Sequence, residues 1–253
     1  MIASLPLNLL IDGPCDGAWN MALDEVLLDE AAEGELGYWR FYQWQRPTLS
    51  LGYFQDATER AGHQPSRRCP MVRRLTGGGA ILHDIELTYS LVLPASHPMC
   101  RQRERLYATV HQSLIATLAE HWRIPASLCP GGASGAGREE PFLCFQRRAP
   151  GDVLVDVAKI AGSAQRRRRG AVLQHGSVLL DTSEKAPELP GLREVTGREI
   201  HPDALRDAWL EVLQRTLAER WEPAELSNAA RLRTSERTFG KYTSGWWNEN
   251  RGR

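Results

Sequence analysis

Hydrophobic residues recur with helical spacing in three segments of the chain, which predicts three long helices. The segments are Trp19 to Ala31, Leu106 to Trp122 and Leu205 to Trp221. His201-Pro202-Asp203 stands at the predicted start of the third helix, where proline fits the first turn. The first segment predicts a helix with one apolar side and one solvent-exposed side.

Shorter runs of alternating or continuous apolar residues predict strands. In chain order they are Leu7 to Asp12, Tyr38 to Trp44, Pro47 to Gly52, Met71 to Arg74, Glu86 to Pro94, Val153 to Val157, Lys159 to Ala164 and Ala171 to Leu180. Residues 127–140 predict a loop, and the polar, aromatic residues 231–253 a packed tail. Because strand often follows strand, we expect an α+β fold with a mixed, largely antiparallel sheet flanked by helices, in one domain spanning 1–253.

Charge and cysteine content narrow the class of protein. The chain has 31 Lys and Arg against 31 Asp and Glu, so its net charge gives no indication of nucleic acid or of an anionic membrane as a partner. Its five cysteines are odd in number and form no CxxC pair, which argues against a disulfide framework and a zinc site. No stretch approaches the roughly 20 apolar residues of a membrane span. We therefore expect a cytoplasmic protein without a metal.

Three segments contain residues suited to chemistry. The first is RRLTGGGAILHD at 73–84, in which the peptide N–H groups of Gly77 to Ala80 could face an oxyanion or a phosphate. The second, KIAGSAQ at 159–165, places Lys159 in an apolar strand where partial desolvation makes a lysine chemically usable. The third, QHGSVLL at 174–180, brings His175 beside a glycine. Taken singly, each is also consistent with a glycine-rich turn, a solvent-facing lysine and a structural histidine.

Together, in order and spacing, these segments resemble the signatures of the lipoate-protein ligase A and octanoyltransferase superfamily. NMALDE at 20–25 and RPTLSLG at 46–52 are similar to the opening of the same family, so the resemblance covers about the first three quarters of the chain. It implies a fold related to the catalytic domains of biotin ligases and class II aminoacyl-tRNA synthetases, with a tunnel for an acyl chain. It implies substrate-binding roles for Arg73, Arg74, Thr76, Gly77, Gly78, Gly79, Ala80, His83, Gly162, Ser163, Ala164, His175 and Gly176.

Cys144 distinguishes the two activities within this superfamily. The segment PFLCF at 141–145 resembles the one that carries the nucleophile in LipM-type octanoyltransferases, which implies catalytic roles for Cys144 and Lys159. A nearby ammonium raises the thiolate fraction of a cysteine, and a neutral lysine can take a proton from an incoming amine. Backbone amides near Gly78 and Gly79, or near Gly162 and Ser163, are candidate oxyanion donors. The alternative is that Cys144 is a small buried hydrophobe beside Phe142 and Phe145.

The resemblance implies an acyltransferase that needs no cofactor. It would move octanoyl, or lipoyl, from octanoyl-acyl carrier protein to a lysine of glycine cleavage H protein or of a lipoyl domain of a 2-oxoacid dehydrogenase. One alternative is a lipoate-protein ligase that uses ATP and Mg²⁺, and another is a non-catalytic binder of acyl groups. Residues 85–88 depart from the family pattern after His83-Asp84, which puts an ATP or metal role of Asp84 in doubt.

Two further segments lead to predictions about partners and access. Arg166 to Arg169 form a basic turn that could steer acidic partners, and Arg147-Arg148 could extend it. The glycines between 131 and 137 predict a flap over the tunnel.

Overall fold

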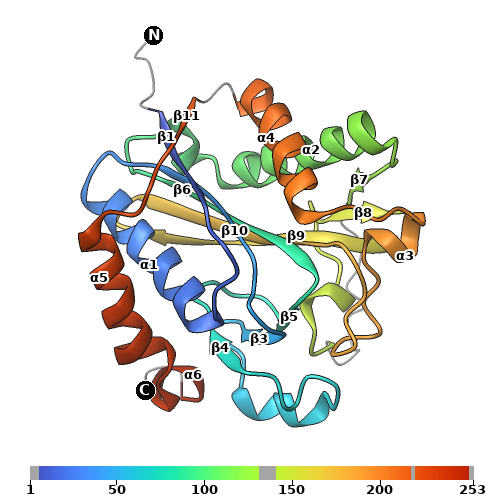
Figure 1. Ribbon diagram of the computed structural model, residues 1–253, viewed down its shortest axis with the longest axis horizontal. Coiled ribbons are helices and arrows are strands. Elements are labelled where there is room, and N and C mark those ends of the chain that lie inside the picture. The colour runs from blue at the N-terminus through green and yellow to red at the C-terminus, as the bar shows by residue number, and fades with distance from the viewer. Residues whose placement is uncertain (1–5, 131–140, 218–219, 251–253) are drawn as a thin grey trace.

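An eight-stranded sheet forms the centre of the computed structural model, which describes residues 6–130, 141–217 and 220–250 (Figure 1). The strand order is β11-β1-β2-β6-β10-β9-β8-β7. The strands are β1 (Leu7–Ile11), β2 (Tyr38–Tyr42), β6 (Glu86–Leu93), β7 (Ser127–Leu128), β8 (Val153–Val155), β9 (Ala158–Arg168), β10 (Ala171–Leu179) and β11 (Trp221–Pro223). β1 pairs in parallel with β11 and β2, and the other pairings are antiparallel, which confirms the predicted mixed, largely antiparallel sheet.

A small second sheet carries the glycine loop. Its order is β4-β3-β5, with β3 at Thr48–Leu51, β4 at Met71–Arg73 and β5 at Ile81–His83. The loop between β4 and β5 holds the three successive glycines. Short 3₁₀ helices occupy Ala57–Gly62 (η1), Pro98–Arg101 (η2) and Cys144–Gln146 (η3). Cys144 therefore begins a single helical turn that follows the segment 131–140.

Helices cover both faces of the main sheet (Figure 1). On one face α2 (Arg103–Trp122) packs beside α4 (Pro202–Leu217), and on the other α1 (Gly17–Glu33) packs beside α5 (Asn228–Arg237). The remaining helices are α3 (Leu192–Thr196), the π-helical η4 (Thr238–Tyr242) and α6 (Gly245–Asn248). Trp209 of α4 packs edge-on against Trp39 and Tyr89, with ring centroids 6.4 and 5.1 Å away. Such aromatic contacts fix the α2–α4 layer on the sheet.

The C-terminal segment corrects one prediction. Residues 228–248 form three helical segments that pack on the protein, and they cover the side of α1 that was expected to face solvent. Glu25 on that side is buried, and its carboxylate accepts hydrogen bonds from Lys241, Tyr242 and Arg168. Amphipathic spacing could not show this, because these donors lie far from α1 in sequence.

Two predicted boundaries are also wrong. The third long helix ends at Leu217, and Trp221 instead starts β11, where it lies opposite Leu7 of β1. Trp221 continues the helical spacing in sequence, but its pairing with β1 places it in a strand. Within the predicted loop, Ser127–Leu128 forms a short strand against β8. Among the described residues, no helix combines the length and the apolar composition needed to cross a bilayer.

Candidate active site

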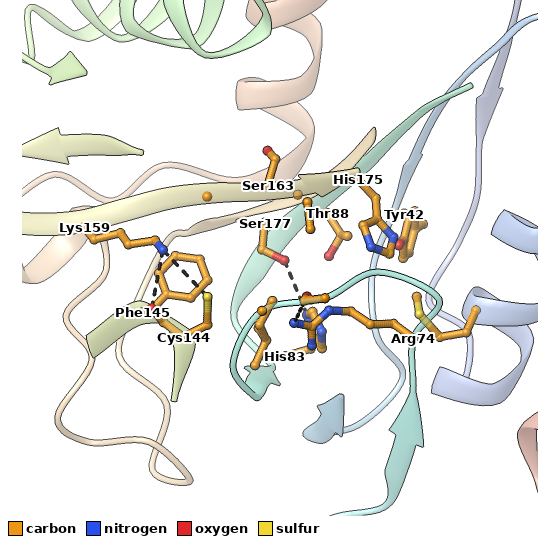
Figure 2. Close-up of a pocket in the computed structure, with 17 residues that line it drawn as sticks. Tyr42, Arg74, His83, Thr88, Cys144, Phe145, Lys159, Ser163, His175 and Ser177 are labelled. Carbon is orange, nitrogen blue, oxygen red and sulfur yellow. Dashed lines mark hydrogen bonds between the residues drawn. The ribbon is translucent and has the colours of Figure 1, made fainter. Parts of the chain in front are cut away.

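A cavity lies between the glycine loop, η3 and the centre of β9 and β10 (Figure 2). Its empty space is about 520 Å³ with the open mouth included, and the centre of a water-sized sphere can reach about 60 Å³ of it. The sequence-predicted residues that line it are Arg74, Gly77, Gly78, His83, Cys144, Lys159, Gly162, Ser163, Ala164, His175 and Gly176. Segments more than 100 residues apart in the chain thus meet at one cavity.

Four residues predicted to bind substrate do not line this cavity. The Arg73 guanidinium donates instead to backbone carbonyls, among them Gly52 O at 2.8 Å and Asn248 O at 2.7 Å. The Thr76 hydroxyl lies 2.7 Å from Nε2 of His175. Ala80 N–H donates to Phe142 O at 3.1 Å, so it is not free to face an oxyanion. The polar groups of these residues bind other parts of the chain, so the residues support the cavity wall and do not face the cavity.

Gly79 allows the glycine loop to pack directly against the nucleophile segment. A Cβ on Gly79 would lie 3.1 Å from Phe142 O and 3.2 Å from the Cys144 backbone nitrogen. In the same contact Cys144 N–H donates to Ala80 O at 2.7 Å. Backbone hydrogen bonds in both directions therefore join the glycine loop to the Cys144 segment, although the two lie far apart in the chain.

Cys144, Lys159 and Asp152 form a compact group at one end of the cavity (Figure 2 shows the first two). The Lys159 Nζ atom lies 3.8 Å from Cys144 Sγ and 3.4 Å from Cys144 O. It also forms an ion pair with Asp152 Oδ2 at 2.8 Å, and both side chains are buried. Cys144 itself is partly exposed. A half-buried thiol beside an ammonium is the setting in which a cysteine becomes an effective nucleophile.

Gly162 makes room for the lysine. A Cβ at this position would lie 2.7 Å from Lys159 Cε and 3.0 Å from Lys159 Nζ. A side chain at position 162 would displace the end of Lys159 from this position beside Cys144. The glycine of the KIAGSAQ segment thus has a packing reason that its sequence context alone did not give.

Arg74 orients the peptides of the glycine loop. Its Nη2 donates to Gly77 O at 2.8 Å and to Gly79 O at 2.7 Å, and burial lowers the pKa of Arg74 to about 10. Since a peptide N–H points opposite to the carbonyl it is bonded to, Gly78 N–H points away from Arg74. Gly78 has φ of 91°, a conformation that favours glycine, and a Cβ there would lie 3.8 Å from Cys144 Sγ.

At the opposite end of the cavity, Asp24 collects polar groups from several elements. His175 Nδ1 lies 2.9 Å from Asp24 Oδ2, Tyr42 donates its hydroxyl at 3.2 Å and Arg40 Nη1 donates at 2.8 Å. Burial alone would raise the pKa of Asp24, but the hydrogen bond from His175 and the charge of Arg40 more than offset it and lower that pKa. His175 and Tyr42, which line the cavity, therefore have polar atoms that are already satisfied.

Glu86 is a second buried carboxylate that binds the polar groups of residues lining the cavity. Its Oε1 lies 2.7 Å from His83 Nδ1 and accepts hydrogen bonds from the hydroxyls of Ser177, at 2.8 Å, and Thr88. Burial lowers the pKa of His83, although Glu86 opposes the shift. The two buried carboxylates thus engage the polar groups of the lining residues. The surface left to a ligand suits an apolar chain, although many lining residues are polar by type.

A further hydrogen-bond network supports the lysine from the α2 side. Tyr107 donates to Asp152 Oδ1 at 3.1 Å and accepts from Ser163 N–H at 3.2 Å. Since Ser163 N–H is used in this way, it is not available as an oxyanion donor. His111 Nδ1 lies 2.6 Å from Gly151 O, and its Nε2 lies 2.6 Å from Ser163 Oγ. Because a carbonyl can only accept, His111 carries its proton on Nδ1 and accepts from Ser163.

The predicted basic turn does not form one continuous patch. β9 extends to Arg168, so successive arginines point to opposite faces of the sheet, and the turn itself is Arg169-Gly170. Arg168 forms ion pairs with Glu25 and Asp29, whereas Arg166 lies over the Tyr53 ring. The predicted flap at 131–137 lies outside the described residues. Within the described ranges, no group of three or more His, Cys, Asp or Glu side chains is arranged to hold a metal ion.

Sequence reasoning missed several residues of this site. Asp24 and Ser177 stand inside the quoted segments NMALDE and QHGSVLL, so membership of those segments was the available signal. Asp152 precedes β8 by one residue, and no local pattern linked it to Lys159. Tyr107 and His111 lie in the predicted helix one residue after the apolar positions Leu106 and Val110, and nothing in that spacing indicates a site. The roles of Asp152, Tyr107 and His111 depend on tertiary contacts.

The chain is similar to known proteins over most of its length. Octanoyltransferase LipM from Geobacillus kaustophilus is 33% identical over 94% of this chain and 96% of its own length. Octanoyltransferase LipM from Staphylococcus aureus is 36% identical over 69% of this chain and 66% of its own length. A putative lipoate protein ligase from T. acidophilum superposes with a TM-score of 0.78 at 23% identity, over 97% of this chain and 100% of that one.

The family profile of the lipoyl protein ligase A/B catalytic domain matches residues 16–189, a span that contains the glycine loop, Cys144, Lys159 and His175. The chain therefore belongs to the lipoyl protein ligase A/B catalytic domain family.

Proposed function

We propose that the chain is a cysteine-dependent octanoyltransferase. It would take octanoyl, or lipoyl, from octanoyl-acyl carrier protein and transfer it to a lysine of glycine cleavage H protein or of a lipoyl domain, without a cofactor. The observation that carries the proposal is the 3.8 Å separation of Cys144 Sγ and Lys159 Nζ at the end of a cavity suited to an apolar chain. Its relatives named octanoyltransferase support the acyl group chosen.

In the first half-reaction the Cys144 thiolate attacks the carbonyl carbon of the donor thioester. The bond to the donor sulfur breaks, and the leaving thiolate receives the proton that Cys144 gave up, passed through Lys159. The acyl group is then held on Cys144 as a thioester. Since one thioester is exchanged for another, this step needs alignment and an oxyanion donor rather than ATP. The Gly78 amide is our candidate donor.

In the second half-reaction the neutral amine of the acceptor lysine attacks the Cys144 thioester. A carbon–nitrogen bond forms, the carbon–sulfur bond breaks, and the amine proton passes to the Cys144 sulfur. Lys159, which the first half-reaction leaves neutral, takes this proton from the amine and gives it to the leaving sulfur, which regenerates the starting enzyme.

Intact mass spectrometry tests the proposal. The purified protein and its Cys144→Ser variant are each mixed with octanoyl-acyl carrier protein in the absence of ATP. We expect an octanoyl adduct on the unmodified chain that hydroxylamine removes, and no hydroxylamine-labile adduct on the variant. No adduct on either protein, together with acylation of a lipoyl domain from free octanoate and ATP that survives Cys144→Ala, would show a ligase instead. Binding of octanoate with no acylation under either condition would show a non-catalytic binder.

A further inference from the structure

Phe54 is an exposed aromatic residue at the rim of the cavity. Its side chain is 71% exposed, and a Cβ on Gly77 would lie 3.9 Å from its ring carbon Cδ2. A Cβ on the next residue, Gly78, would lie 3.8 Å from Cys144 Sγ. Two glycines therefore lie between this exposed ring and the sulfur atom. A single exposed hydrophobic residue is common, so its position beside the nucleophile is what calls for explanation.

The loop that presents Phe54 is held by buried groups. Arg73 Nη1 donates to the carbonyl oxygens of Gly52 at 2.8 Å, Tyr53 at 3.3 Å and Gln55 at 2.8 Å. Tyr53 N–H donates to Thr76 O at 2.8 Å, which ties this loop to the glycine loop. An aromatic side chain on a preorganised backbone loses little conformational freedom when it meets a partner.

Arg166 adds a cation to the same surface. Its guanidinium carbon lies 5.1 Å from the centre of the Tyr53 ring, and the Tyr53 and Phe54 rings meet edge to face at 4.9 Å. Within the part of the chain that the structure describes, no carboxylate forms an ion pair with Arg166. Aromatic residues and arginine are enriched at the energetic centres of protein interfaces. Tyr53, Phe54 and Arg166 are called the rim surface below.

We propose that the rim surface docks the acceptor protein whose lysine is acylated. This inference rests on the proposed function, because the transfer requires an amine at Cys144. A lysine has only a four-carbon stem, so the acceptor must lie directly against the rim when its amine reaches the thioester. An acyl group delivered on an extended thioester arm is not restricted in this way. Arg166 favours an acceptor whose surface next to the lysine is acidic.

Steady-state kinetics with an apo-lipoyl domain test the docking surface. At saturating octanoyl-acyl carrier protein, we expect Phe54→Ala to raise the KM for the lipoyl domain about tenfold while kcat stays within twofold. We expect Arg166→Gln to raise it about threefold, and less at high salt. Phe239→Ala is the matched control, since Phe239 is 74% exposed on η4. Arg167→Gln is the control for Arg166, because adjacent strand residues face opposite sides.

The proposal is overturned if Phe54→Ala leaves the KM for the lipoyl domain within twofold, or if it raises the KM for the carrier protein instead. Fluorescence anisotropy of a labelled apo-lipoyl domain, titrated with Cys144→Ser protein with and without Phe54→Ala, gives a readout that needs no chemistry. Weaker binding of the Phe54 variant without any acyl transfer would keep the docking surface and reject the proposed function. Unimpaired transfer to the lipoyl domain by Phe54→Ala would reject the docking surface and keep the proposed function.

Discussion

Two buried ion pairs lie toward opposite ends of the cavity, and they differ in the cation. At the inner end Arg40 is completely buried and bonds Asp24, Asp12 and Asn20. At the Cys144 end Lys159 bonds Asp152. Burial alone would lower the pKa of Arg40, but Asp12 and Asp24 more than offset it and raise that pKa.

The difference in the cation corresponds to a difference in role: the Arg40 pair supports the fold, and the Lys159 pair lies beside the nucleophile. Arginine stays charged and fills a fixed fork of hydrogen bonds, so it can hold α1 against β2 permanently. Lysine is a compact charge that can exchange a proton with a reacting group, and it is placed beside the one cysteine that lines the cavity among the described residues. We expect changes at the inner pair to affect stability first, and changes at the outer pair to affect transfer first.

The largest effect is expected at the inner pair. Asp24→Ala removes the partner of Arg40, His175 and Tyr42, and should lower the free energy of unfolding by about 3–5 kcal/mol. Urea denaturation measures the change. Asp203→Ala is the control, because Asp203 forms an exposed ion pair with Arg206 and should cost less than about 1 kcal/mol. A loss below about 1 kcal/mol for Asp24→Ala would contradict a structural role for the pair.

A charge-conserving change at the outer pair separates charge from proton transfer. Lys159→Arg keeps a cation beside Asp152, but a guanidinium does not release its proton. We expect transfer to the lipoyl domain to fall by about a hundredfold or more. The free energy of unfolding should change by about 1–2 kcal/mol, owing to the larger side chain. Near-normal transfer by the arginine variant would mean that Lys159 acts only through its charge.

An effect that is absent at neutral pH concerns acid stability behind the outer pair. Burial lowers the pKa of His111 to about 4, against 6.5 for a free histidine. Between these pH values the unfolded chain binds one proton more at this residue, so its contribution to stability is complete above pH 6.5 and is lost as pH falls toward 4. We expect His111 to contribute roughly 1.4 kcal/mol per pH unit in this window. His111→Gln should remove that slope from urea titrations at several pH values, and an unchanged slope would assign it to other groups.

The signatures at 73–84, 159–165 and 174–180, together with Cys144, were enough to predict the family, the fold class and most of the residues that line the cavity. They succeeded because their order and spacing together resemble one family, although each segment taken singly has a structural alternative. Arg73 shows where this reasoning stopped: it adjoins Arg74 in sequence, yet the two side chains of neighbouring strand-end residues leave in different directions.

The sequence by itself determined the periodic segments, and therefore the three long helices and most strands of the main sheet, because local spacing decides which face of an element is apolar. It also determined the nucleophile and lysine as candidates. Only the tertiary structure decided that Asp152 pairs with Lys159, that Asp24 and Glu86 engage the polar lining, and that the C-terminal helices bury the outer side of α1. These contacts join residues far apart in the chain, and a charge or hydroxyl has no preferred partner until folding brings one within hydrogen-bonding distance.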